Sequence, residues 1–188
     1  YPDGTFRADR QMTRAEVTMM FARLLKDRPL GRPFMLSRYS DVAEYNWYSY
    51  AVDYMSEQGI VSGYPDGTFR PNEPITRAEF ASIAARFDKL TSVGNSMFTD
   101  VSDDHGAAKV IARAEKKGWV SGYPDGTFKP NQNITRAEVV SATNRILNRY
   151  ADIEFVKAHK LELAPMTDIE ETHWGYSAIA EAMNGHEY

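Results

Sequence analysis

Three arginines occupy the same place in a tetrad, Thr-Arg-Ala-Glu, that occurs three times. They are Arg14, Arg77 and Arg136. Each tetrad predicts a helix start, because a threonine at the N-cap and a glutamate three residues later form a capping box. The arginine then lies in the first helical turn, where the macrodipole disfavours a cation. It is suited to gripping a carboxylate or phosphate beside free backbone N–H groups, and an ion pair within the protein explains it equally well.

Three aspartates are the expected partners in such an ion pair, which would also orient the arginine for a ligand. Each stands between Ser or Thr and Val or Ile; they are Asp41, Asp100 and Asp168. Trp47 and Trp174 follow the first and third aspartate by six residues, and Gly106 takes that place in the middle copy. A tryptophan is most often a core residue, but beside an arginine at a groove it also offers a face on which a sugar ring stacks. Spacing alone does not separate these two roles.

The elements that position these residues come from a repeat. Tyr-Pro-Asp-Gly-Thr-Phe begins at Tyr1, Tyr64 and Tyr123, and each tetrad begins 12 residues later. Proline fixes φ and glycine supplies a left-handed conformation, so this motif predicts a tight turn before a helix. A calcium loop is the alternative, but the positions that should supply its end ligands do not do so in all copies.

The repeats are out of phase with the ends of the chain. Two complete units span residues 39–90 and 98–149, while residues 1–30 and 165–188 hold a carboxyl half and an amino half. A helical hairpin cannot bury its apolar face alone, so we expect the two halves to pair, to bring Tyr188 close to Tyr1, and to make residues 1–188 one body. Apolar residues at helical spacing after each tetrad predict an all-α fold with the three tetrad helices as a central bundle.

Composition excludes several classes of protein. The chain has 43% hydrophobic and 26% charged residues, no cysteine and a net charge of −4. No apolar run is long enough to span a bilayer. The negative net charge argues against a nucleic-acid binder, which normally has a basic domain. The histidines lack metal-ligand spacing, and phosphate-loop and nucleophile-elbow motifs are missing, so we expect no metal, no cofactor and no enzyme. A second arginine recurs nine residues after the first, at Arg23, Arg86 and Arg145, and we expect these to be solvated or ion-paired surface residues.

Together the aspartate, the tryptophan, the Gly-x-x-Ser-Gly-Tyr-Pro-Asp-Gly-Thr-Phe centre and the tetrad resemble the S-layer homology family. The resemblance covers nearly the whole chain, apart from connections around residues 28–38, 89–97 and 148–165. It implies a monomeric, pseudo-threefold (trimeric) spindle with grooves between its units. It also implies an extracellular module at the bacterial cell surface, which anchors proteins by binding secondary cell-wall polysaccharide, often through a pyruvate-ketal amino sugar. A protein–protein assembly module of a surface layer is the alternative function.

The resemblance further implies a set of residues for each groove, in which the arginine holds the pyruvate carboxylate and a Ser-Gly backbone donates hydrogen bonds. The first groove takes Arg77, Asp41, Trp47, Ser62 and Gly63, the second Arg136, Asp100, Ser121 and Gly122, and the third Arg14, Asp168 and Trp174. Because Gly106 replaces the tryptophan of the second groove, we expect the Arg136 groove to bind most weakly. His186, where Gly59 and Gly118 end the corresponding helices, makes the closing junction atypical.

Overall fold

A computed structural model of the chain describes residues 1–25, 37–89, 95–159 and 166–184. These residues contain seven α-helices and no β-strand, which confirms the all-α class. The helices are α1 (Arg14–Leu24), α2 (Ser49–Glu57), α3 (Arg77–Phe87), α4 (Ala108–Lys116), α5 (Arg136–Ile146), α6 (Ile153–Ala158) and α7 (Tyr176–Asn184). No helix among the described residues has the length and apolar character needed to cross a membrane.

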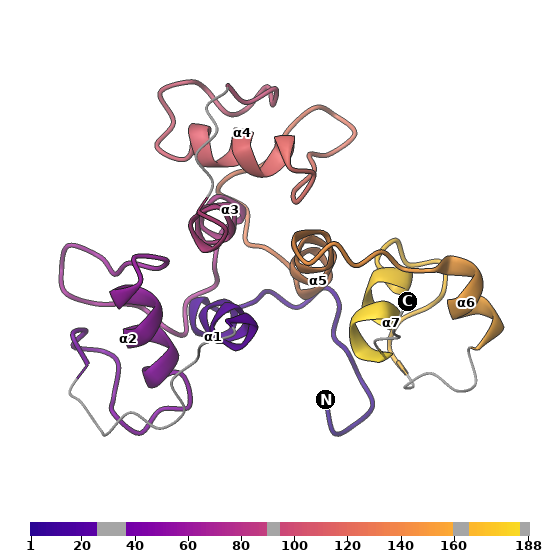
Figure 1. Cartoon of the computed structure of the whole chain (residues 1–188), viewed down its shortest axis with the longest axis horizontal. Coiled ribbons are helices and arrows are strands. Elements are labelled where there is room, and N and C mark those ends of the chain that lie inside the picture. The colour runs from indigo at the N-terminus through magenta and orange to yellow at the C-terminus, as the bar shows by residue number, and fades with distance from the viewer. Residues whose placement is uncertain (26–36, 90–94, 160–165, 185–188) are drawn as a thin grey trace.

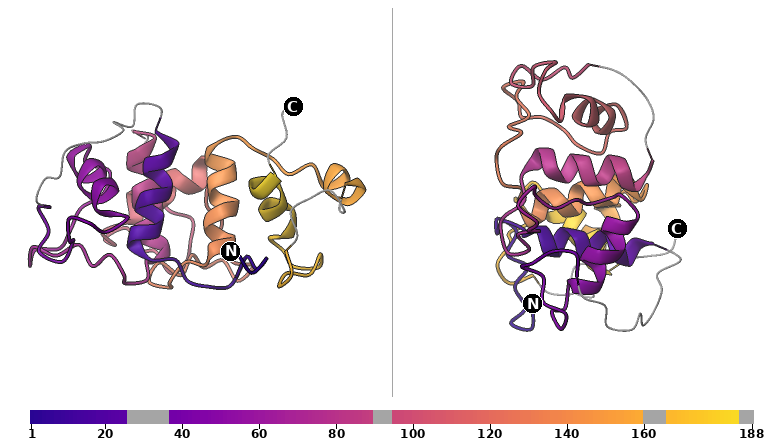
Figure 2. Two further views of the ribbon diagram at one scale, coloured as in Figure 1. Left: turned by 90° about the horizontal axis from the view of Figure 1, so that it is seen from below. Right: turned by 90° about the vertical axis from the view of Figure 1, so that its left-hand side faces the viewer.

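The tetrad helices α1, α3 and α5 begin where the sequence predicts. Each N-cap threonine accepts a hydrogen bond from the backbone of the N3 glutamate, whose side chain accepts one in return; the N-caps are Thr13, Thr76 and Thr135. Figure 1 shows these three helices at the centre of the molecule, with α2, α4 and α7 outside them. They lie roughly parallel in Figure 2. Helix α1 packs on α2, α3 on α4 and α5 on α7, giving three lobes.

The core lies where the tetrad helices face one another and their outer partners. Phe21 and Phe80, on α1 and α3, are fully buried, with ring centroids 5.8 Å apart. A smaller cluster joins the amino-terminal segment to α5 and α7 through Phe6, Ala137 and Ile179. Burying these apolar faces against one another explains why the short helices are stable together.

The segment that follows each turn motif crosses the start of another repeat's helix. The backbone N–H of Arg14 donates to the carbonyl of Glu73 (3.0 Å), and that of Arg77 donates to Gln132 (2.9 Å). The amino-terminal segment completes the series, because Arg136 N–H donates to the carbonyl of Arg10 (2.9 Å). Isolated β-bridges follow the same circuit, joining Thr13 to Pro74, Thr76 to Asn133 and Gln11 to Thr135. The three repeats are thus linked in a closed ring.

The two chain ends contact one another through the turn motif. Phe6 and Arg7 each donate a backbone N–H to Asp168, both at 2.7 Å, and Thr167 donates to the carbonyl of Gly4. The carboxyl half and the amino half therefore meet, as expected. The unit boundaries remain a prediction, and the expectations for Tyr188 and His186 lie outside the described residues.

Candidate functional site

The three repeated aspartates clamp the backbone of the turn motif. Asp41 accepts the N–H groups of Phe69 and Arg70, both at 2.7 Å, and Asp100 does the same for Phe128 and Lys129. Arg70 has a left-handed backbone with φ of 57°, a conformation that is uncommon for residues other than glycine and that brings these two N–H groups toward one carboxylate. The expected ion pair between these aspartates and the tetrad arginines is therefore wrong, because the carboxylates already serve the turn.

Asp168 makes the same clamp with the amino-terminal turn. Burial acts to raise its pKa, but the backbone N–H groups of Phe6 and Arg7 outweigh this and lower the pKa of Asp168 below its ordinary value. Two hydrogen bonds that favour the charged form have this effect on a carboxylate. The aspartates are thus structural residues that fix the turn beside each groove.

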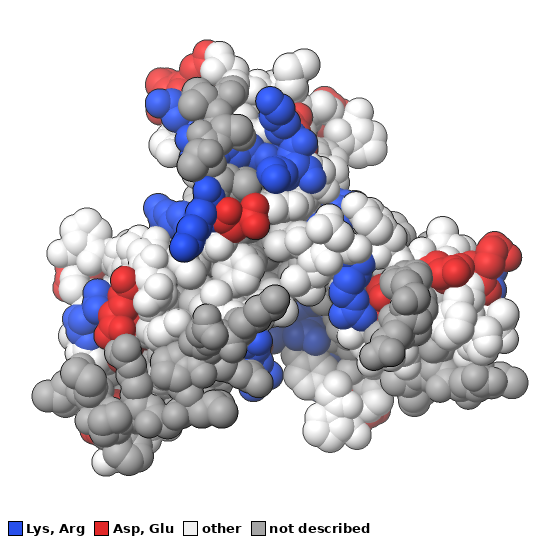
Figure 3. All heavy atoms as spheres, in the orientation of Figure 1, with Lys and Arg blue, Asp and Glu red and all other residues white. Residues whose placement is uncertain are grey.

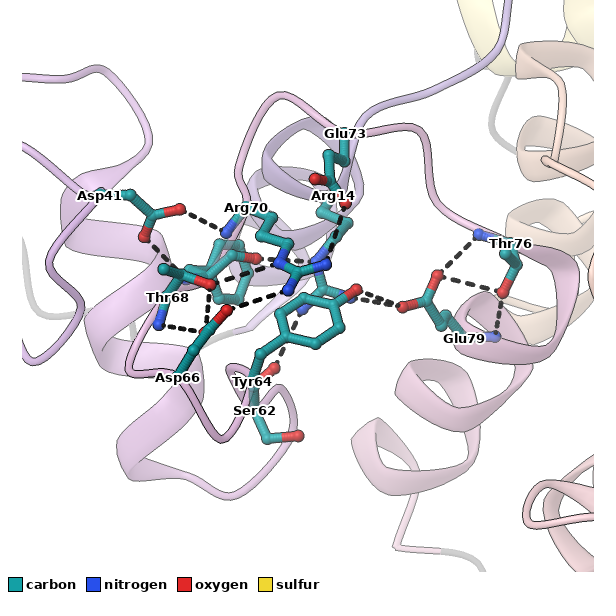
Figure 4. A network of polar contacts seen from close by, with 11 residues as sticks. Arg14, Asp41, Ser62, Tyr64, Asp66, Thr68, Arg70, Glu73, Thr76 and Glu79 are labelled. Atoms are coloured by element: carbon teal, nitrogen blue, oxygen red, sulfur yellow. Dashed lines mark hydrogen bonds and ion pairs between the residues drawn. The ribbon is translucent and has the colours of Figure 1, made fainter.

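The partners of the tetrad arginines are glutamates. Arg14 Nη1 lies 2.8 Å from Glu79 Oε1, while its Nε and Nη2 donate to the carbonyls of Phe69 (2.9 Å) and Ser62 (3.0 Å). The Arg14 side chain is buried, and its guanidinium stands 4.9 Å from the ring centroid of Tyr64. Figure 4 shows this network between the turn motif and the start of α3.

Arg77 repeats the arrangement one unit further on. Its guanidinium donates to Glu138 Oε1 (2.5 Å), to the carbonyl of Phe128 (2.7 Å) and to the carbonyl of Ser121 (2.9 Å). The N–H groups that begin α3 do not form the free anion site considered from the sequence. Arg77 N–H donates to Gln132, and Ala78 N–H donates to Pro130.

The glutamate of each capping box has a second role. Glu79 Oε2 accepts the N–H of Thr76, whereas Oε1 accepts from Arg14 and from the Tyr64 hydroxyl (3.1 Å). Burial raises the pKa of Tyr64, Arg14 opposes this, and Glu79 raises it further. The sequence predicts only the capping role for this glutamate. The cap uses only one carboxylate oxygen, so the second oxygen was the feature from which a further partner could have been inferred.

Arg14 and Arg77 each line a groove one repeat away from the one expected. Arg14, not Arg77, shares a groove with Ser62 and Gly63. Arg77, not Arg136, shares a groove with Ser121 and Gly122. The cause is the segment after each turn motif, which carries the chain across the preceding tetrad helix before the next one begins. The expected groupings are therefore wrong, although several of the predicted residues do line these two grooves, namely Arg14, Arg77, Ser62, Gly63, Ser121, Gly122 and Trp174.

The two grooves differ in size. The Arg77 groove has a volume of about 610 Å³ and is lined by Tyr123, Gln132, Glu138, Arg145 and Trp174 as well as by Ser121 and Gly122. The Arg14 groove has a volume of about 230 Å³ and is lined by Tyr64, Glu79, Ser82, Arg86 and Ala107 as well as by Ser62 and Gly63. Only the larger of the two falls within the range of about 300–1,000 Å³ that small ligands usually occupy.

Two of the second set of arginines line these grooves, contrary to the expectation of a plain surface role, whereas Arg23 is exposed as expected. Arg86 lines the Arg14 groove, and Arg145 lines the Arg77 groove. Nine residues correspond to about two and a half helical turns, so the two arginines of one helix project from opposite sides. Helix α3 thus presents Arg77 to one groove and Arg86 to another.

The tryptophans six residues after an aspartate are surface residues rather than core residues. Trp47 is 59% exposed and Trp174 is 63% exposed, whereas Trp119 is buried. Trp174 lines the Arg77 groove, and Ala107, which follows Gly106, lines the Arg14 groove. The position without a tryptophan is therefore beside Arg14, so the reason given for a weak Arg136 groove is wrong.

Arg136 has a different environment from its two counterparts. Its Nε donates to the carbonyl of Phe6 (3.0 Å), and its guanidinium stands over the rings of Phe6 and Tyr1 at 4.6 and 5.0 Å. Within the described part of the chain it has no carboxylate partner. Glu16, the counterpart of Glu79, pairs with Arg10 instead. Arg136 therefore contacts two aromatic rings and one carbonyl in place of a glutamate.

The Ser-Gly pair of each groove is shaped by an aromatic ring behind it. A Cβ atom on Gly63 would stand 2.2 Å from the Tyr39 ring, and one on Gly122 would stand 2.3 Å from Phe98, so only glycine allows these approaches. Gly63 N–H donates to the Tyr39 hydroxyl at 3.1 Å, which uses the donor that was expected for a ligand. The neighbouring side chain of Ser62 is exposed at the groove.

No group of three or more metal-ligating side chains occurs among the residues that the structure describes.

The aspartate in the Asp-Gly-Thr centre of the turn motif is engaged by the turn itself. Asp66 accepts hydrogen bonds from the backbone and hydroxyl of Thr68 and pairs with Arg70 at 3.0 Å. These contacts, led by that with Thr68, lower the pKa of Asp66 to about 2.

Comparison with known proteins identifies relatives along the whole chain. A sequence model of the S-layer homology domain matches residues 1–18, 38–81 and 98–140, together more than half of the chain. Cell surface glycoprotein 1 of Acetivibrio thermocellus is 38% identical over all of this chain and 8% of its own length. The cellulosome-anchoring protein of the same organism is 37% identical over all of this chain and 42% of its own length. An amylopullulanase of Thermoanaerobacterium thermosulfurigenes is 36% identical over 80% of this chain and 8% of its own length. The chain spans less than half the length of each of these relatives.

Proposed function

The chain belongs to the S-layer homology domain family, and we propose that it anchors a larger protein to the bacterial cell wall by binding secondary cell-wall polysaccharide. Its relatives bear the names of cell-surface, cellulosome-anchoring and surface-layer proteins, which supports a wall-associated location. The anchoring unit is a pseudo-threefold spindle, and its ligand is a pyruvate-ketal amino sugar held in the grooves between lobes. We assign no catalysis to this segment; some of its relatives are named as enzymes, but they are much longer proteins.

The single observation that carries this proposal is the composition of the Arg77 groove. It combines an exposed indole at Trp174, the two cations of Arg77 and Arg145, and the exposed hydroxyl of Ser121. An aromatic face beside polar donors is suited to a sugar ring, and a guanidinium fork is suited to a carboxylate. A pyruvate ketal supplies both features in one residue.

The two cations have different roles in this proposal. Arg77 already makes three hydrogen bonds within the protein, which fix its position and leave its other N–H groups for a ligand. Arg145 is half-buried and has no carboxylate partner among the residues described. Arg145 therefore gives the groove a cation whose charge is not neutralised locally, and Arg77 positions the carboxylate against it.

Calorimetric titration with purified wall polymer, before and after chemical removal of its pyruvate, tests the proposal. We expect Arg145→Gln and Trp174→Ala each to weaken binding to the pyruvylated polymer. A lost charge-assisted contact costs about 1.5–3 kcal/mol, or roughly 10- to 150-fold in affinity. Lys157→Gln removes a cation from the exposed face of α6, outside both grooves, and is the matched control.

Equal affinity for pyruvylated and depyruvylated polymer would contradict the carboxylate assignment. Association of the purified chain with itself, combined with no binding to either polymer, would favour the alternative of a protein–protein assembly module. Trp47→Ala tests whether the counterpart tryptophan also serves a groove, and we expect it to weaken polymer binding as well.

A further inference from the structure

A second hollow shares a wall with the Arg77 groove. This space, the Glu170 hollow, has a volume of about 510 Å³ and lies where the amino-terminal segment meets the segment before α7. Residues 7–10 form one wall, and the opposite wall is formed by Asp168, Ile169, Glu170, Thr172 and His173. Its volume falls within the range of about 300–1,000 Å³ that small ligands usually occupy.

The hollow and the Arg77 groove meet at two places. Asp9 lines both of them. His173 lines the hollow, the next residue, Trp174, lines the groove, and the two ring centroids are 5.6 Å apart. The His173 ring is held in place, because its Nδ1 accepts the Gly175 N–H at 3.1 Å and its Nε2 lies 3.8 Å from Asp9. A ligand on the Trp174 indole therefore has the hollow as its immediate neighbour.

The two arginines and one aspartate of the hollow are engaged by the protein itself. Arg7 pairs with Asp3 at 2.9 Å, and Arg10 pairs with Glu16. Asp168 accepts the two backbone N–H groups of the amino-terminal turn, both at 2.7 Å. These contacts fix the walls of the hollow and neutralise both arginines.

The other two carboxylates of the hollow are more open to a ligand. The side chain of Asp9 is 90% exposed and lies near His173. Glu170 is exposed and accepts the Thr172 hydroxyl at 3.4 Å. A carboxylate has about four acceptor sites, so both residues keep acceptor capacity for hydroxyl groups that enter the hollow.

The fold does not require a carboxylate at either of these positions. In the other two copies of the repeat, neither position is acidic. The counterparts are Asn72 and Asn131 for Asp9, and Ala43 and Ser102 for Glu170. The clamp aspartate, which the turn needs, is the same in all three copies. Asp9 and Glu170 therefore change the chemistry of the surface without serving the turn.

The hollow and the groove differ in charge. With its arginines neutralised, the hollow has the negative charges of Asp9, Asp168 and Glu170. The Arg77 groove contains the cation of Arg145, and Asp9 at the shared wall offsets it only from that side. An acidic sugar is disfavoured in the hollow by repulsion, whereas a sugar hydroxyl can donate to its carboxylates.

Charges of both signs are mixed over the molecule as a whole. In Figure 3, Lys and Arg as well as Asp and Glu side chains lie on each of the three lobes. Exposed charges more than about 10 Å apart are largely screened by salt. The preference of a site for an acidic or a neutral sugar is therefore set by the residues that line it.

We propose that the Glu170 hollow is a second glycan subsite, which binds the sugar residue next to the pyruvylated one. Its carboxylates accept hydrogen bonds from the hydroxyl groups of a sugar that has no acidic group. This inference rests on the proposed function. It gives the module two adjacent sites of different preference, the Arg77 groove for an acidic sugar and the hollow for a neutral one.

The test compares synthetic probes on the intact chain by calorimetric titration. The first probe is the methyl glycoside of a pyruvate-ketal N-acetylated amino sugar. The second pair adds a neutral hexose on its reducing or its non-reducing side, and the third pair adds a hexuronic acid at the same places. We expect the better neutral disaccharide to bind about 3- to 10-fold more tightly than the monosaccharide, as one net hydrogen bond allows. The hexuronic acid should give no gain.

A local signal shows where the second sugar binds. The backbone amide NMR signals of Glu170 and Thr172 should shift with the neutral disaccharide and not with the monosaccharide. A gain in affinity without these shifts would place the second sugar elsewhere and overturn the inference.

Two substitutions remove the carboxylates and introduce residues that other copies of the repeat already have. We expect Glu170→Ser to remove most of the gain of the disaccharide and to leave the Kd of the monosaccharide unchanged, because Glu170 lines the hollow rather than the groove. Asp9→Asn, which alters the shared wall, should weaken the disaccharide as well. Glu154→Gln removes an exposed carboxylate of α6 and is the matched control, expected to change neither Kd.

The outcomes separate this inference from the proposed function. If the monosaccharide binds but neither neutral disaccharide binds more tightly, or if the gain survives Glu170→Ser, the hollow is not a subsite and the glycan-binding function stands. An equal gain from the hexuronic acid would contradict the preference for a neutral sugar. If neither the probes nor wall polymer binds, the proposed function is wrong and the inference falls with it.

Discussion

Replacing Arg77 with methionine should destabilise the fold more than replacing Arg136, although both occupy the same position of the repeat. The Arg77 side chain is 7% exposed and donates to Glu138, Phe128 and Ser121. Its loss leaves Glu138, which is 16% exposed, without a counter-charge. Breaking a buried pair costs about 3–5 kcal/mol, and because Glu138 keeps the Thr135 N–H and some solvent, we expect about 2–4 kcal/mol.

Urea unfolding followed by far-ultraviolet circular dichroism measures this cost. For a chain of this size, that loss corresponds to a fall in Tm of roughly 5–15 °C. Arg136→Met removes one hydrogen bond from a half-buried side chain, and we expect about 1 kcal/mol. Adding Glu138→Gln to Arg77→Met should recover about 1 kcal/mol, because the uncompensated charge is removed.

Equal costs for Arg77→Met and Arg136→Met would refute this reasoning. So would a double variant that is less stable than Arg77→Met alone. Either result would mean that the carboxylate at the start of α5 does not depend on the arginine of α3. The comparison also matters for binding studies, because a substitution of Arg77 changes stability as well as any ligand contact.

Three other changes test separate features. Asp41→Ala removes the clamp on two turn N–H groups and should cost about 2–4 kcal/mol in urea unfolding, with Asp41→Glu as a variant that keeps the charge. Because the pKa of Asp66 is lowered to about 2, its contribution to the free energy of unfolding is complete above about pH 4 and is lost as the pH falls through 2. Asp66→Asn should therefore show a smaller fall in the urea midpoint over that interval; an identical fall would argue against it. Gly122→Ala places a Cβ atom 2.3 Å from Phe98 and should cost about 1–3 kcal/mol, whereas Gly106→Ala, which meets nothing within 4 Å, should be close to neutral.

Features with local causes could be predicted from the sequence. The starts of α1, α3 and α5 follow from capping boxes, because the threonine and glutamate of each box are neighbours on one helical turn. The turn motif follows from the conformations that its proline and glycine allow. The three repeats and the contact between the two chain ends follow from the phase of the repeat, since each half-unit leaves an apolar face to be covered.

The sequence could not predict which residues together form each groove. Arg14 contacts Ser62 because the chain crosses α1 before it begins α3. An arrangement in which Arg77 contacts Ser62 would have the same motifs at the same spacing, so the sequence does not distinguish the two. The role of Arg145 was missed for a related reason, because a helix with two arginines on opposite sides does not reveal which neighbour each side will face. Identical repeats carry identical local signals, so they specify the helices and turns of each unit. Which unit's arginine faces which unit's backbone is decided by the path of the connecting segments and by packing between distant residues, and these exist only in the folded chain.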